Sequence, residues 1–163
     1  MQRGEDMSNE IERNYLVRDD RFLCGRDGVR LTQGYIPGRQ HAAARVRISG
    51  ERGFITFKGE ATGISRREFE YEIPLVDAEE MLQLLCEKPF IEKMRYEIEH
   101  AGSIWEVDVF GGDNEGLVVA EIELEREDQE IDLPPWLGDE VSGDERYFNA
   151  SLAIDPYKNW RKS

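Results

Sequence analysis

The stretch Asn9–Val17 reads NEIERNYLV, in which Glu10, Glu12 and Asn14 occur at every second position. Because residues two apart in a strand point to the same face, these three share one side, and Ile11 and Tyr15 share the other. Neighbouring carboxylates repel each other, so a cation, a metal ion or water must accompany them. The segment therefore predicts a β-strand with one acidic face.

The same alternation recurs along the chain and predicts an all-β-dominated protein with few helices. Turn-forming residues separate most of the alternating segments, which is typical of antiparallel hairpins. The expected strands are Asn9–Val17, Val29–Ile36, Ala44–Ser49, Gly53–Lys58, Arg66–Pro74, Phe90–His100, Ser103–Phe110 and Val118–Glu127.

Two segments depart from this alternation and predict helices. Apolar residues after Asp77 recur at helical spacing, so we expect a helix that Asp77 caps and that ends near Lys88. A short C-terminal helix is expected within Glu145–Ala153, and the Pro-rich stretch Leu133–Gly138 is expected to be a loop.

The length and the termini favour one domain. With 163 residues the chain is long enough to bury a core, and we expect a single domain over residues 8–163 after a leader or tag remnant at residues 1–7. The first residues are charged and lack the apolar core of a secretory signal. The two cysteines are far apart in the sequence, which favours reduced thiols and a cytoplasmic location.

Composition also limits the partners. The net charge of −14 argues against nonspecific nucleic-acid binding, which needs a basic surface. No apolar run is long enough to span a bilayer, so no membrane partner is expected. An anionic small molecule stays compatible with this charge if the few basic residues gather in one place.

The charged faces of the strands carry like-charged pairs, and acidic strands alternate with basic ones. The simplest interpretation is that these are solvated faces of an ordinary sheet. Like charges this close cost stability, however, and a face selected for solubility would mix the two signs. A sheet that curls with its charged faces inward explains the pattern better, because it forms a barrel with a polar bore and an apolar exterior.

Such a bore has a defined chemistry. Paired carboxylates suit Mg²⁺ or Mn²⁺, and Arg and Lys suit phosphate oxygens. A metal–polyphosphate complex requires both, so Glu10 and Glu12 are interpreted as metal ligands.

Eight ordered segments carry a family resemblance: EIERxxLV, RVRI, TFKG, SRREFEYEI, EKMRY, WEVDVF, AEIELE and RYFNASLA. In this order, from Glu10 to Ala153, they resemble the motifs of the CYTH superfamily, also called triphosphate tunnel metalloenzymes, and most of all its bacterial inorganic triphosphatase-like members. The resemblance implies a closed eight-stranded antiparallel barrel with a polar interior and helices outside. It also implies a triphosphate bound there with a divalent metal ion.

The resemblance assigns roles position by position. It implies that Glu121 and Glu123 join Glu10 and Glu12 as metal ligands. The substrate-binding cations would be Arg45, Arg47, Lys58, Lys93, Arg95 and, at a late basic position, Arg146. The supporting tunnel wall would consist of Asn14, Arg66, Glu68, Glu70 and Asp108. Lys58 or Lys93, with a pKa lowered by neighbouring cations, is a candidate catalytic proton acceptor.

One position departs from the family pattern. The motif continues as ExExK, but the third inward position here is Asn14. An amide donates a hydrogen bond to phosphate without neutralising its charge, so the bore lacks one cation.

The resemblance implies metal-dependent hydrolysis of a triphosphate, with inorganic tripolyphosphate as the first substrate and Mg²⁺ or Mn²⁺ as cofactor. Adenylate cyclase and thiamine or nucleoside triphosphatase activities are the enzymatic alternatives. Asn14 keeps open a non-catalytic protein that binds triphosphate or polyphosphate. The apolar exterior leaves room for a homodimer.

Overall fold

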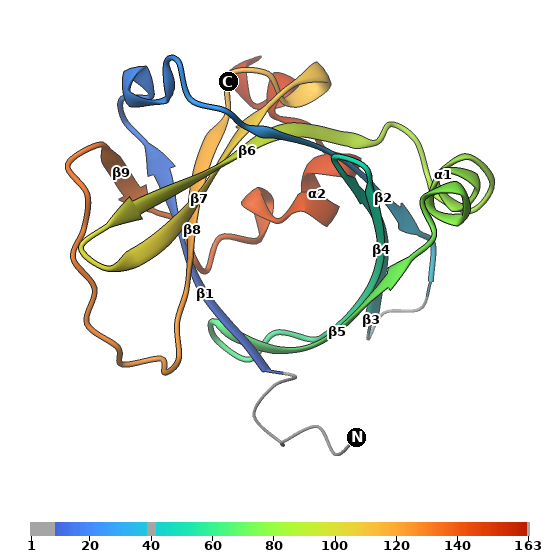
Figure 1. Ribbon diagram of the computed structural model, residues 1–163, viewed down its shortest axis with the longest axis horizontal. Coiled ribbons are helices and arrows are strands. Elements are labelled where there is room, and N and C mark those ends of the chain that lie inside the picture. Colours follow the sequence, from blue (N-terminus) through green and yellow to red (C-terminus); the bar gives the residue numbers. More distant parts are fainter. Residues whose placement is uncertain (1–8, 39–41, 163) are drawn as a thin grey trace.

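Eight antiparallel strands close into a barrel in the computed structural model, which describes residues 9–38 and 42–162 (Figure 1). The strands are β1 (Asn9–Val17), β2 (Val29–Ile36), β3 (Ala42–Ser49), β4 (Arg52–Gly59), β5 (Ser65–Ile73), β6 (Ile91–His100), β7 (Ser103–Phe110) and β8 (Val118–Glu123). The predicted closed barrel is confirmed, and the expected leader at residues 1–7 lies outside the described residues.

Two meanders form the wall of the barrel. Strands β2 to β5 pair in sequence order, as do β6 to β8, and β2 pairs with β6 to join the two groups. Strand β1 closes the ring because it pairs with β8 through residues 12–16 and with β5 through residues 9–11. The acidic strand that opens the sequence is therefore the closing strand of the barrel.

The main apolar core lies outside the ring. Tyr15, Trp105 and Ile122 point away from the bore and pack under a cover that includes Trp136 and the added strand β9 (Leu137–Glu140). On the opposite side, helix α1 (Leu75–Leu84) covers β3 and β4, where Val46 packs against Leu82 (Figure 1). Because both cores use the outward side chains of the strands, the inward side chains are left for polar residues.

The interior is not polar throughout. Helix α2 (Asn149–Ile154) lies inside the ring in the view of Figure 1, and Leu152 packs there against Ile91, Phe110 and Val119. This apolar cluster fills one end of the bore, where the sequence pattern predicted helices only on the outside. The barrel is therefore closed at one end by its own C-terminal segment.

Several element boundaries differ from the predictions. Helix α1 begins two residues before Asp77, and Pro74 occupies its N-cap, where a missing N–H costs nothing; the expected Asp77 cap is wrong. The C-terminal helix is divided, because Phe148 adopts an extended conformation between the turn Glu145–Tyr147 and α2. The predicted loop Leu133–Gly138 contains the start of β9. No helix among the described residues has the length and apolar character needed to cross a membrane.

Candidate functional site

The inward side chains of the barrel line a cavity of about 550 Å³. Thirteen of the fifteen residues that the sequence pointed to reach this cavity: Glu10, Glu12, Asn14, Arg45, Arg47, Lys58, Arg66, Glu68, Glu70, Lys93, Arg95, Glu121 and Glu123. The expectation that charged residues two apart on successive strands converge on one enclosed channel is met. Asp108 and Arg146 are the two that do not line it.

Arginines of β3 form one wall of the cavity. Arg45 and Arg47 both donate to Glu70 on β5, with N–O distances of 3.4 and 3.2 Å. Their Nε–H groups are buried and have no acceptor within the described chain. Because an unsatisfied buried donor is costly, two guanidinium donors remain available for an anion in the cavity.

Lys58 stands between two carboxylates. Its Nζ lies 2.9 Å from Glu10 and 3.3 Å from Glu68. Burial and a shared hydrogen bond with Glu10 raise the pKa of Glu68 to about 7. Burial works to lower the pKa of Lys58, but the charges of Glu10, Glu12 and Glu68 together outweigh it and the pKa is raised. Lys58 is therefore held protonated, which disfavours its predicted role as a proton acceptor.

A buried ion network supports the wall formed by β6 and β7. Asp108 is fully buried and accepts from Lys93 at 2.6 Å and from Arg95 at 2.7 Å. Burial opposes ionisation of Asp108, but the two cations lower its pKa below the usual range. Burial also lowers the pKa of Lys93, the direction that a proton acceptor requires. Asp108 therefore holds two cations of the cavity in place without lining the cavity itself, whereas the resemblance implied a residue of the tunnel wall.

The carboxylates of β1 and β8 form a negatively charged corner. Glu12 lies opposite Glu123 in the strand register, and Asn14 lies opposite Glu121. Burial, followed by the charges of Glu121 and Glu10, raises the pKa of Glu12 to about 7. The one hydrogen bond to its side chain among the described residues comes from the Asn14 amide at 3.4 Å. Glu10 and Glu121 are ion-paired, with Lys58 at 2.9 Å and with Arg95 at 3.2 Å, whereas Glu12 and Glu123 make no ion pair within the described residues.

The pKa of Glu12 predicts a pH-dependent stability. A carboxyl group whose native pKa is raised destabilises the fold as pH rises from its ordinary value through about 7, because the native state must then give up a favoured proton. In metal-free buffer we expect Glu12→Gln to raise the free energy of unfolding at pH 8 by about 1–2 kcal/mol and to change it little at pH 4.5. Urea denaturation at both values measures this, and an equal effect at both would contradict the assignment.

Two pairs of cavity residues escaped the sequence pattern. Gln33 and Tyr35 on β2 line the cavity, and the Gln33 amide donates to the Tyr35 hydroxyl at 3.2 Å. Both are uncharged, so the search for charged pairs passed over them, although they are paired in register with Arg47 and Arg45. Phe148 and Asn149 enter the cavity from the C-terminal segment.

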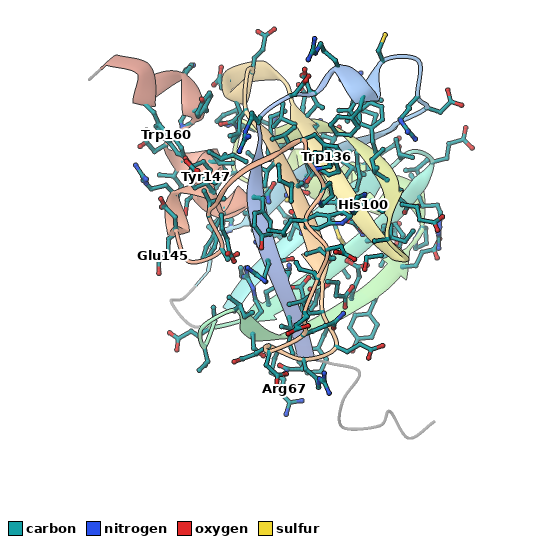
Figure 2. The ribbon with its side chains drawn as sticks, turned by 90° about the vertical axis from the view of Figure 1, so that its left-hand side faces the viewer. Arg67, His100, Trp136, Glu145, Tyr147 and Trp160 are labelled. Atoms are coloured by element: carbon teal, nitrogen blue, oxygen red, sulfur yellow. The ribbon has the colours of Figure 1, made fainter. Side chains whose placement is uncertain are left out.

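Arg146 lies outside the cavity. Its side chain is 69% exposed, is bonded to Asp144, and stacks over Trp160 at 5.5 Å. Figure 2 shows the neighbouring Tyr147 and Trp160 together on this flank, where their rings meet edge to face. Arg146 therefore lies away from the cavity where the resemblance implied a substrate contact, and its role in substrate binding stays a prediction.

The site defines a class of protein: a closed β-barrel whose bore holds unpartnered guanidinium donors on one wall and, on another, two carboxylates that make no ion pair among the described residues. Such a tunnel suits an anion that carries its own cation. The sequence profile of the CYTH domain family matches residues 9–155, and the chain belongs to this family.

Characterised relatives agree with this assignment. The chain is 49% identical to an inorganic triphosphatase of Acetivibrio thermocellus, over 96% of this chain and all of that protein. It is 39% identical to an inorganic triphosphatase of Nitrosomonas europaea, over 89% of this chain and 97% of the relative. The crystal structure of an inorganic triphosphatase superposes with a TM-score of 0.64 at 37% identity, covering 89% of this chain and 94% of the other.

Proposed function

We propose that this protein hydrolyses inorganic triphosphate in a reaction that depends on a divalent metal ion, Mg²⁺ or Mn²⁺. The observation that carries the proposal is that charged groups of both signs inside the bore lack partners. Arg45 and Arg47 hold buried N–H donors without an acceptor, while Glu12, half-buried beside Glu10 and Glu121, makes no ion pair among the described residues. A metal–triphosphate complex supplies both missing charges, and the names of the relatives point to the same substrate.

The donor set fits the chemistry of a hard divalent cation. Glu10, Glu12, Glu121 and Glu123 offer carboxylate oxygens, the ligands that Mg²⁺ and Mn²⁺ prefer. Within residues 9–38 and 42–162, no three His, Cys, Asp or Glu side chains are already gathered closely enough to hold a metal ion. Mg²⁺ is commonly bound by one or two carboxylates together with substrate phosphates, so these residues would hold it jointly with triphosphate. When bound, the ion supplies neutralisation of the charge on the phosphate oxygens.

The cations of the chain would orient the substrate. Arg45 and Arg47 on β3 would bind phosphate oxygens together with Lys93 and Arg95 on β6, which is separated from β3 by β2 alone. Phosphoryl transfer gains most from an in-line geometry and from preorganised positive charge. Because the guanidinium and ammonium groups are already held by Glu70 and Asp108, little reorganisation is needed when triphosphate enters.

The test is a release assay for phosphate. Purified protein is incubated with tripolyphosphate, pyrophosphate, ATP or thiamine triphosphate, each with Mg²⁺, Mn²⁺ or EDTA, and cyclic AMP is measured in the ATP reactions. We expect phosphate release from tripolyphosphate with metal, and much slower release from the other three substrates. Cyclic AMP formation, or faster hydrolysis of ATP or thiamine triphosphate, would replace this proposal with one of the other enzymatic activities.

Asn14 gives a second candidate function, a protein that binds triphosphate without hydrolysing it. The amide faces Glu121 across the strand pair, where the family motif has a lysine. We expect Asn14→Lys to lower the KM for tripolyphosphate about tenfold, because a cation there attracts phosphate and offsets the acidic corner. Steady-state kinetics of both proteins measures this change. A wild-type protein that binds tripolyphosphate without turnover, with hydrolysis appearing only in Asn14→Lys, would support the binding function.

A further inference from the structure

The two residues that begin the C-terminal helix contact opposite walls of the barrel. The ring of Phe148 lies 5.3 Å from the guanidinium carbon of Arg66 on β5. The side-chain oxygen of Asn149 accepts from Nζ of Lys93 on β6 at 3.1 Å. Around the ring the strands follow the order β1, β5, β4, β3, β2, β6, β7, β8, so three strands separate β5 from β6 in either direction. Residues 148–149 therefore cross the bore between two of its cations.

Packing at the end of the bore holds this crossing in place. Leu152, one turn further along α2, is 1% exposed and packs against Ile91 and Phe110 inside the barrel. Its backbone N–H donates to the carbonyl of Phe148 at 2.9 Å, which ties the crossing residues to the packed turn. The backbone that carries Asn149 is therefore held by this packing, and its side chain contacts Lys93 from a fixed position.

The hydrogen bonds of Lys93 leave one direction open. A lysine nitrogen has three tetrahedral positions beyond its carbon. One N–H donates to Asp108 at 2.6 Å and another to Asn149 at 3.1 Å. No protein acceptor for the third position is present among the described residues, and Lys93 lines the cavity with a side chain only 2% exposed. Asp108 and Asn149 together determine where that third position points.

We infer that Asn149 is a positioning residue, which orients the Lys93 nitrogen so that its third position faces the phosphate chain in the cavity. As an ammonium, Lys93 then donates an N–H to a phosphate oxygen, and as a free amine it directs its lone pair to the same place. With Asp108 alone, the nitrogen can rotate about a single strong hydrogen bond. Lys93 then keeps its charge, but its third position no longer has a fixed direction. Asn149 thus acts through Lys93 in the site described under the proposed function, and its role rests on that function.

The experiment uses three variants of the full chain. Asn149→Leu removes the acceptor at similar volume, and Asn149→Asp keeps an acceptor oxygen. Asn114→Leu is the control for a purely structural role, because Asn114 is 4% exposed and anchors the same C-terminal segment by accepting from the Tyr157 N–H at 2.8 Å. For each protein, calorimetry measures tripolyphosphate binding in EDTA, and steady-state assays with Mg²⁺ measure kcat and KM.

We expect Asn149→Leu to weaken metal-free tripolyphosphate binding and to lower kcat, each about tenfold. Asn149→Asp keeps the acceptor but adds a negative charge that repels phosphate, so its kcat should stay within about threefold of wild type while its metal-free binding weakens. Asn114→Leu should lower the melting temperature while its binding stays within about twofold. The inference is overturned if folded Asn149→Leu binds as tightly as wild type, or if Asn114→Leu weakens binding equally. Binding by wild type without turnover would refute the proposed hydrolysis alone, and the binding data would still decide the role of Asn149.

Discussion

Asp108→Asn is expected to be among the most destabilising single substitutions in this protein. The carboxylate is fully buried and is shared by Lys93 and Arg95 at 2.6 to 2.8 Å. An amide keeps the shape but removes the charge and turns one end into a donor. Buried Lys93 then has no carboxylate partner, and Arg95 retains only Glu106 and Glu121. Breaking a buried ion network in this way costs about 3–5 kcal/mol, so the melting temperature should fall by roughly 10 °C.

The pH dependence of the free energy of unfolding distinguishes the loss of the Asp108 ion pairs from a general destabilisation of the barrel. The pKa of Asp108 is lowered from its ordinary value of 3.8, so its contribution is complete above that value and is lost as pH falls through the lower native pKa. The deficit of Asp108→Asn should therefore be the same at pH 5 and pH 8. Urea denaturation at both pH values measures it.

A matched control is available on the surface. Glu72 also pairs with an arginine, Arg52, at 2.6 Å, but the two side chains are 52% and 64% exposed. Exposed pairs contribute little, so Glu72→Gln should leave the unfolding transition nearly unchanged. Similar small effects of both substitutions would show that Asp108 does not hold Lys93 and Arg95 in place.

The contrast between Asp108 and its neighbours shows what the sequence can and cannot predict about this site. Period-two alternation assigned Glu10, Glu12, Arg45 and Arg47 to the inner face, and all four line the cavity. The resemblance placed Asp108 in the tunnel wall, but its carboxylate is buried between Lys93 and Arg95 and does not line the cavity. A pattern along single strands has no information about that packing.

Two further misses have the same physical origin. Arg146 belongs to a segment that resembles the family, yet the turn Glu145–Tyr147 directs its side chain to Asp144 and away from the bore. Gln33 and Tyr35 are inward because of their register with β3, which is known only once the strands are paired. The bore was predicted from pairs of like charges on successive strands. Uncharged residues of the bore, such as Gln33 and Tyr35, form no such pairs and were therefore not predicted.

Glu123→Ala is expected to lower metal-dependent turnover of tripolyphosphate by about 100-fold or more, since loss of a metal-binding oxygen removes several kcal/mol of charge stabilisation. The register places Glu123 directly opposite Glu12, and Glu121 precedes it on the same face of β8. If the four carboxylates hold the cation as proposed, removing Glu123 takes away one of its oxygen ligands and weakens its binding beside the phosphates. The apparent metal affinity should therefore fall together with the rate.

Glu125 supplies the matched control for this second prediction. It continues the same row and lines the cavity, but it lies beyond the end of β8, where its backbone N–H is bonded to Gln129. Glu125→Ala removes the same charge from the bore without removing a carboxylate from the register with β1. Mn²⁺ titrations of phosphate release compare the two variants with wild type. If Glu123→Ala retains metal-dependent turnover, or if Glu125→Ala loses as much, then general acidity of the bore rather than this pair of strands holds the cation.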